Sequence, residues 1–220
     1  MDKLSSLLFK EFHLELRRKS VLSGLALYLI STVFICYTTF ALRNNLITPL
    51  VWGALFWITI LFTAISTVAK SFIGEKKGKD IYYYSIARPE SVILSKIIYN
   101  FFLCASLSLT GLVLFIVFLQ NPVQDMTLFI LLILLTSFGL SSSLTLLSGI
   151  AAKANNSNIL MAILGFPVII ATLLMAIKVT KNCLDGLDRS VSWDDMLILA
   201  AINCITTAMS YLLFPYIWRS

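Results

Sequence analysis

Residues 131–174 read LLILLTSFGLSSSLTLLSGIAAKANNSNILMAILGFPVIIATLL and carry the strongest fold signal in the chain. Two apolar runs, 128–151 and 159–177, flank the short polar segment 152–158. Each run is close to the roughly 20 residues that a helix needs to cross the hydrocarbon core of a bilayer. The segment between them is long enough only for a tight turn, so the stretch predicts a hairpin of two membrane helices.

Four further runs of this kind occur, at 21–42, 50–69, 98–119 and 197–217. The 220 residues are 59% hydrophobic and 13% charged, whereas a soluble domain is about 45–50% apolar and about 25% charged. Despite its net charge of +6, this composition excludes a soluble enzyme, a disordered chain and a nucleic-acid-binding domain. Because the period-two alternation of barrel strands is absent, we predict an all-α integral membrane protein with six transmembrane helices.

The basic residues predict how the chain is oriented in the membrane. Most of the 17 Lys and Arg residues lie in the N-terminal segment and between the second and third runs, and Lys153 and Arg219 fall on the same side. By the positive-inside rule this side is cytoplasmic, so both termini are expected inside. An acidic partner of the basic face is the alternative to a role in topology and lipid contact.

The runs lack the residues that ion coupling and catalysis need. No Lys, Arg, Asp, Glu or His lies in the middle of a run, which argues against a proton-coupled transporter or a pump with its own ion pathway. Residues 74–80, GEKKGKD, resemble a phosphate-binding loop, but the first glycine is one residue too close and Asp80 replaces the required Ser or Thr. His13, the single histidine, has no neighbouring cluster of metal ligands, so we predict no catalytic residue and no metal site.

Residues 1–20 form the first predicted unit, a cytoplasmic amphipathic helix. Its apolar side chains recur at helical spacing, at Leu4, Leu7, Leu8, Phe12 and Leu16. Glu11 and Glu15 fall within the apolar arc, where a helix lying only on lipid does not usually place acids. This favours a helix that rests partly against protein, with Glu15 able to pair with Lys19; a plain interfacial helix is the alternative.

Residues 21–220 form the second predicted unit, a membrane domain whose longest inside loop is 70–100. Gly78 and the pair Arg88-Pro89 break this loop, and Pro89 can open the next helix at its first position. Residues 80–87 between the breaks are long enough for a short helix that carries Tyr82, Tyr83 and Tyr84. Since tyrosine is enriched at protein interfaces, this helix is a candidate docking surface; a belt of tyrosines at headgroup level is the alternative.

The fourth run is rich in small residues. Gly139 with Ser143, and Thr145 with Gly149, form small-xxx-small pairs that let helices approach closely. Packing within the bundle is the simplest interpretation, and a subunit interface or the lining of a polar pathway are the alternatives. Pro167 is expected to kink or break the fifth helix.

Two groups of residues resemble the CcmB family, the membrane subunits of the ATP-binding-cassette (ABC) system of cytochrome c maturation. In the loop, Phe72, Glu75, Gly78, Pro89 and Lys96 match the family's order of acid, glycine, proline and lysine. In the hairpin, residues 147–156 and 163–167 resemble the family's Ala-Ala-Lys turn and its Phe-Pro helix. The chain departs from the family at Ala171, where a second proline is common, and at the loop tyrosines, where leucines are usual.

The resemblance implies a permease in the bacterial inner (plasma) membrane, not itself an enzyme. It would pair, as a homodimer, with a separate CcmA-like ATPase subunit and associate with CcmC-like and CcmD-like subunits. ATP hydrolysis would then drive release of the haem-loaded chaperone, a CcmE-like protein, with ATP and haem bound through those partners. On this interpretation the coupling residues are Glu75, Gly78, Asp80, Tyr82, Tyr83, Tyr84, Arg88, Pro89 and Lys96. A type-2 ABC exporter permease for another amphiphile, or a non-transporting membrane scaffold, are the alternatives.

Overall fold

The computed structural model describes residues 7–9, 11, 13, 19–41, 47–68, 72, 88–153 and 157–219. Each regular element in these ranges is an α-helix. They are α2 (Lys19–Ala41), α3 (Pro49–Val68), α5 (Pro89–Leu119), α6 (Met126–Lys153), α7 (Ser157–Asp185) and α8 (Arg189–Arg219). All six are long and apolar enough to cross a membrane, which confirms the predicted all-α class with six candidate spans.

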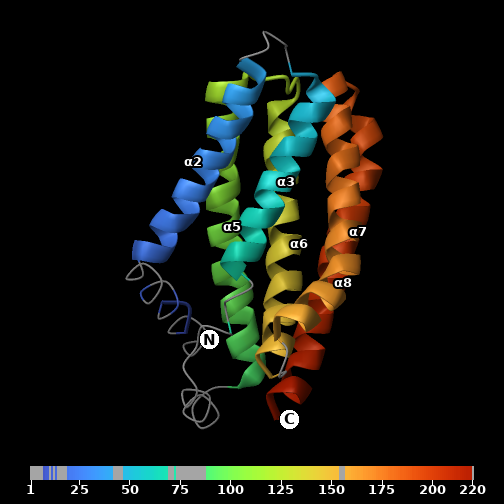
Figure 1. Cartoon of the computed structure of the whole chain (residues 1–220). Helices are drawn as coiled ribbons and strands as arrows, with labels where there is room; N and C mark the ends of the chain where they lie inside the picture. Colours follow the sequence, from blue (N-terminus) through green and yellow to red (C-terminus); the bar gives the residue numbers. More distant parts are fainter. Residues whose placement is uncertain are drawn as a thin grey trace.

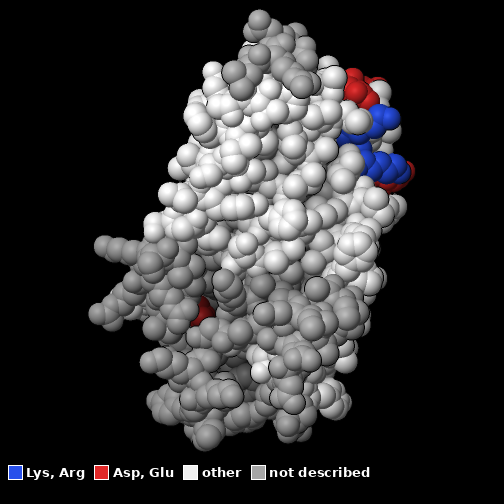
Figure 2. Space-filling model, in the orientation of Figure 1, with Lys and Arg blue, Asp and Glu red and all other residues white. Residues whose placement is uncertain are grey.

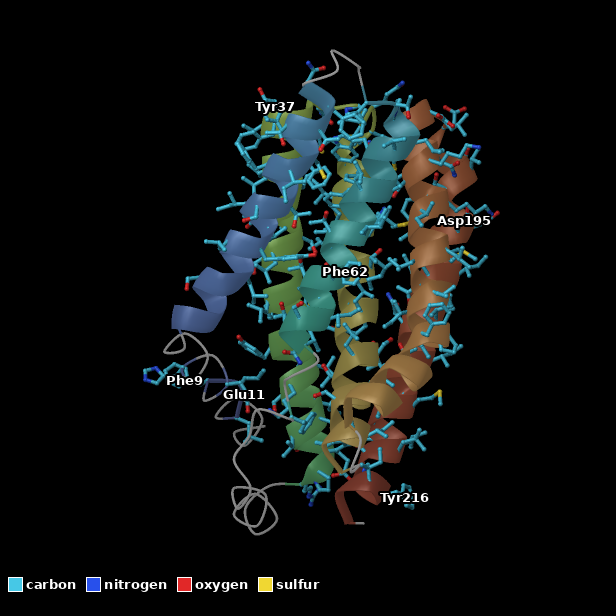
Figure 3. The ribbon with its side chains drawn as sticks, in the orientation of Figure 1. Phe9, Glu11, Tyr37, Phe62, Asp195 and Tyr216 are labelled. Atoms are coloured by element: carbon cyan, nitrogen blue, oxygen red, sulfur yellow. The ribbon has the colours of Figure 1, made fainter. Side chains whose placement is uncertain are left out.

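Successive helices run in alternating directions along one bundle (Figure 1). Glu11 and Tyr216 lie at one end, which we call the terminal end, whereas Tyr37 and Asp195 lie toward the other, the far end (Figure 3). In the view of Figure 2, the described surface carries a group of Lys, Arg, Asp and Glu side chains at the far end and almost no charge between the two ends. An uncharged band of this kind fits a hydrocarbon environment.

Helix α6 is the centre of the bundle, because it packs against α3, α5, α7 and α8. In the membrane-spanning stretch of α6, 67% of the residues are buried inside the protein. In α2, which packs against α3 and α5 at the edge of the bundle, the share is 17%. Near the far end, the rings of Trp52, Phe56, Phe115 and Phe129 join α3, α5 and α6. The Trp57 indole donates a 2.8 Å hydrogen bond to Thr180 Oγ1, which ties α3 to α7. The core is thus built around α6, and α2 is its least buried member.

Helix boundaries differ from the apolar runs where helices carry polar residues. Helix α5 begins at Pro89 rather than at 98, and Arg88 before it is extended, which confirms Pro89 as the first helical residue. Hydropathy misses these first turns because they hold Ser95 and Lys96, which are buried against protein rather than lipid. The hairpin is confirmed, since α6 ends at Lys153 and α7 begins at Ser157. Of the two effects expected at Pro167, a kink or a break, the break does not occur, because α7 continues through this residue to Asp185.

Ion pairs and backbone hydrogen bonds close the far end. Gln124 and Asp125 in the α5–α6 connection donate backbone N–H groups to the Cys183 carbonyl, at 3.1 and 3.4 Å. Arg189 at the start of α8 donates two hydrogen bonds to the Asp125 carboxylate, at 2.6 and 3.0 Å. These bonds lower the pKa of Asp125 below its ordinary value. The α5–α6 connection is therefore attached to both α7 and α8.

The lowered pKa of Asp125 predicts a pH dependence. The ionised pair stabilises the fold above the unfolded-state pKa of about 3.9, and this stabilisation disappears as the pH falls through the lower pKa of the folded state. We expect Asp125→Asn to lower Tm slightly at pH 7, since an exposed pair contributes little, and the difference from wild type to vanish at pH values below both pKa values. Thermal unfolding in detergent from pH 7 to about pH 2, below both pKa values, measures this, with Asp194→Asn as the control. A constant difference across the range would contradict it.

Candidate coupling site at the terminal end

Lys96 is the centre of a buried cluster at the terminal end. It lies two turns into α5, and its side chain is only 3% exposed. Its Nζ is 3.6 Å from Glu11 Oε2 and 4.7 Å from the centroid of the Phe72 ring. A buried ammonium needs an opposite charge or a ring face to offset its lost hydration. Glu11 and Phe72, from two other segments of the chain, supply one of each.

Phe72 attaches the segment after α3 to the bundle. Its backbone N–H donates a 3.0 Å hydrogen bond to Ser148 Oγ on α6. Its ring lies 5.2 Å from the ring of Phe214 on α8, and both rings are buried. With Lys96 on α5, this single residue contacts three spans, so its position depends on how α5, α6 and α8 are arranged.

Gly149 allows the two phenylalanine rings to reach α6. A β-carbon at this position would lie 3.0 Å from a ring carbon of Phe214 and 3.7 Å from one of Phe72. The first of these distances is tighter than nearly all real contacts of a β-carbon. The predicted small residue at 149 therefore serves packing within the bundle, between α6 and α8.

The described part of the N-terminal segment has two faces. On one face, Leu7 packs against the apolar residues around Phe72, and Glu11 is 8% exposed beside Lys96. On the other, Phe9 is 75% exposed and stacks on His13 at 6.2 Å between ring centroids; Figure 3 shows Phe9 directed away from the bundle, on the opposite side from Glu11. The expectation that this segment rests partly against protein is thus confirmed at Leu7 and Glu11. The predicted pair of Glu15 and Lys19 lies outside the described side chains.

Hydroxyl and amide groups extend this polar packing deeper along α6. The Asn100 amide donates a 2.8 Å hydrogen bond to Thr145 Oγ1, and Asn203 donates a 2.7 Å bond to the Leu135 carbonyl. Ser142 and Thr206 hydroxyls lie 3.2 Å apart. Gly139 faces the Asn203 amide, and Ser143 is buried nearby on α6. Polar side chains of this kind hold membrane helices together by hydrogen bonds across their contacts.

Comparison with known proteins assigns the chain to a protein family. The family whose profile matches is described as CcmB protein, and the match covers residues 2–217. The chain belongs to the CcmB family. CcmB proteins are membrane permeases of the ABC system for cytochrome c biogenesis and haem transport. No curated protein and no solved structure matches the chain.

The structure places three of the coupling residues predicted for this CcmB protein. Arg88 is exposed, Pro89 begins α5, and Lys96 is buried in the cluster above. Arg88 and Pro89 also line, with Leu94 and Tyr211, an open hollow of about 440 Å³ between the start of α5 and α8. The others, Glu75, Gly78, Asp80, Tyr82, Tyr83 and Tyr84, lie outside the described residues.

Sequence reasoning missed two buried amides in this CcmB protein. Asn203 and Asn100 are 1% and 2% exposed, and each bonds across to α6. Charged residues in a run mark ion pathways, whereas an uncharged amide gives no such signal. An amide inside a run is also costly to bury and needs a partner. Asn203, in the middle of the run 197–217, could have been found by that criterion.

Proposed function

We propose that this CcmB protein couples ATP hydrolysis by a separate ATP-binding subunit to haem handling or to release of a haem-loaded chaperone. In this proposal the terminal end faces the cytoplasm of a bacterial cell, and the segment between α3 and α5 receives the ATPase. CcmC-like and CcmD-like subunits and a second copy of this chain complete the complex. Haem and ATP are bound through the partners, and this chain supplies the moving membrane part.

The attachment of Phe72 is the observation that supports coupling most directly. The segment that would bind the ATPase begins next to a residue bonded to α6, packed on α8 and lying under Lys96 of α5. Its other end runs into Pro89, the first residue of a 31-residue helix. A displacement of this segment would therefore be applied to three spans together, because packed interiors transmit strain rather than absorb it.

The topology supports the proposed orientation. Six antiparallel helices in sequence return the chain to the side on which it began. The segments on that side hold most of the Lys and Arg residues, as expected for cytoplasmic segments. Helix α5 is about 46 Å long at 1.5 Å per residue, longer than the roughly 30 Å hydrocarbon core. Lys96 can therefore lie near the membrane interface although it belongs to a spanning helix.

Replacing Tyr82, Tyr83 and Tyr84 together with alanine tests the proposed docking surface. We expect the ATPase subunit to co-purify at least about tenfold less, because tyrosines at interface centres each contribute about 1–2 kcal/mol or more. The measurement is co-purification from membranes in which both subunits are expressed, together with ATP turnover of the purified complex. Tyr216→Ala is the matched control, since Tyr216 is 78% exposed at the same end of the bundle.

Three outcomes of this experiment distinguish the alternatives. Undiminished association and turnover in the triple variant would contradict docking at the tyrosines. A wild-type chain that binds an ATPase but shows no effect of haem or haem chaperone would indicate an exporter of another amphiphile. A wild-type chain that binds no ATPase would indicate a membrane scaffold.

A further inference from the structure

We infer that Glu11 is a positioning residue for coupling: it holds Lys96 against Phe72, so that the N-terminal segment controls the attachment through which the ATPase would act. This inference rests on the proposed function. It adds that a part of the chain before the first span also influences the coupling.

The first step is that one ammonium joins two segments. Lys96 Nζ lies between the Glu11 carboxylate at 3.6 Å and the Phe72 ring at 4.7 Å. Glu11 belongs to the N-terminal segment, and Phe72 follows α3. A change in the position of Nζ therefore changes the surroundings of both segments at once.

The second step concerns charge. The side chains of Lys96 and Glu11 are 3% and 11% exposed, so neither is well hydrated. The Glu11 carboxylate neutralises the ammonium at this depth and so favours its buried position. Without that carboxylate the ammonium has less negative charge beside it, and a lysine side chain is long enough to turn its charged end toward the interface. Such a turn would withdraw Nζ from the ring of Phe72.

The third step is that the described part of the N-terminal segment contacts the bundle through one of its two faces. Leu7 and Glu11 face the cluster, whereas Phe9 and His13 face away from it. The ion pair of Glu11 and Lys96 is thus a polar contact between this face and the bundle that a movement of the segment would change. Leu7 contributes apolar packing to the same residues as Phe72, so both contacts act at one place.

The test uses the complete complex with its ATPase and haem chaperone. Glu11→Gln keeps the size of the side chain and removes its charge. We expect the ATPase to co-purify within about twofold of wild type, while chaperone released per ATP hydrolysed falls by about tenfold, a change of about 1.4 kcal/mol. The charge-exchanged variant Glu11→Lys with Lys96→Glu should recover most of this ratio. His13→Gln, on the opposite face of the same segment, is the control and should behave as wild type.

The outcomes separate this inference from the proposed function. If the wild-type chain fails to bind the ATPase or to release the chaperone, the proposed function is wrong and the inference loses its basis. If ATP hydrolysis drives chaperone release in the wild type, and Glu11→Gln releases as much chaperone per ATP as the wild type, the inference alone is overturned. It is also overturned if Glu11→Gln loses ATPase binding and thermal stability together, because that result indicates a structural role only.

Discussion

Lys96→Met is expected to destabilise the protein by about 3 kcal/mol, near the lower end of the range for breaking a buried ion pair. Methionine keeps most of the lysine stem, so the loss comes mainly from the Glu11 carboxylate, which would lose the ammonium 3.6 Å away while remaining only 11% exposed. Thermal unfolding in detergent should show a Tm lower by several degrees. The same substitution also removes the cation from the Phe72 ring, which should weaken the attachment of the segment after α3.

A double variant distinguishes charge from packing in this experiment. Replacing a whole buried ion pair with apolar residues is often neutral or stabilising, so Glu11→Leu with Lys96→Met should recover most of the lost Tm. If the proposed function holds, the double variant should still fail to couple hydrolysis to chaperone release, because Lys96 no longer joins the two segments. A single variant as stable as wild type would show that the pair contributes nothing to the fold.

Gly139→Ala is the second substitution with a large expected effect. A β-carbon there would overlap the Asn203 amide oxygen and lie 3.1 Å from Thr172 Cγ2. The Asn203 amide cannot simply turn aside, because its nitrogen donates to the Leu135 carbonyl at 2.7 Å. Overpacking of a close contact costs about 1–3 kcal/mol, and the disturbed bond across the helices adds about 0.6 kcal/mol or more. We therefore expect a loss of about 2–3 kcal/mol, measured by thermal unfolding.

The chain offers a matched control for this substitution. Gly24 in α2 has no atom within 4 Å of an added β-carbon, so Gly24→Ala should leave Tm unchanged or raise it, since alanine is the better helix former by about 1 kcal/mol. Combining Gly139→Ala with Asn203→Ala should recover part of the loss by removing the overlap. Equal effects at positions 24 and 139 would show that α8 does not approach α6 as closely as described.

The spans were predictable because the hydropathy and the length of a run are properties of one local stretch of sequence. Each run of about 20 apolar residues can satisfy its backbone only as a helix, and Pro89 signals a helix start by its own geometry. The first turns of α5 and α8 were not predicted, because both hold polar residues that lower their hydropathy. Lys96 of α5 is buried against protein, whereas Arg189 and Asp194 of α8 are exposed. Pro167 shows the same limit, because the continuity of α7 depends on neighbours that a single segment does not reveal.

The candidate site was only partly predictable. The resemblance singled out Phe72 and Lys96, and helical spacing placed Glu11 in an apolar arc. Neither indicated that these residues meet, because α2 and α3 separate Glu11 from the other two in the chain, and Phe72 and Lys96 belong to different segments. Asn203 illustrates a different difficulty: its partner is the backbone carbonyl of Leu135, and a carbonyl is present in each residue, so sequence gives no sign of which one is used.

The polar packing around α6 has a consequence for how the protein is made. Ribosomes produce α6 before α7 and α8, so its hydroxyl-rich face enters the bilayer before the last helix, which carries Asn203 and Thr206, exists. During that interval the face has to be shielded by α3 and α5, by water or by the insertion machinery, because unsatisfied polar groups are costly in hydrocarbon. The hydroxyl-rich face of α6 is thus fully covered only once the 31 residues of α8 have been made.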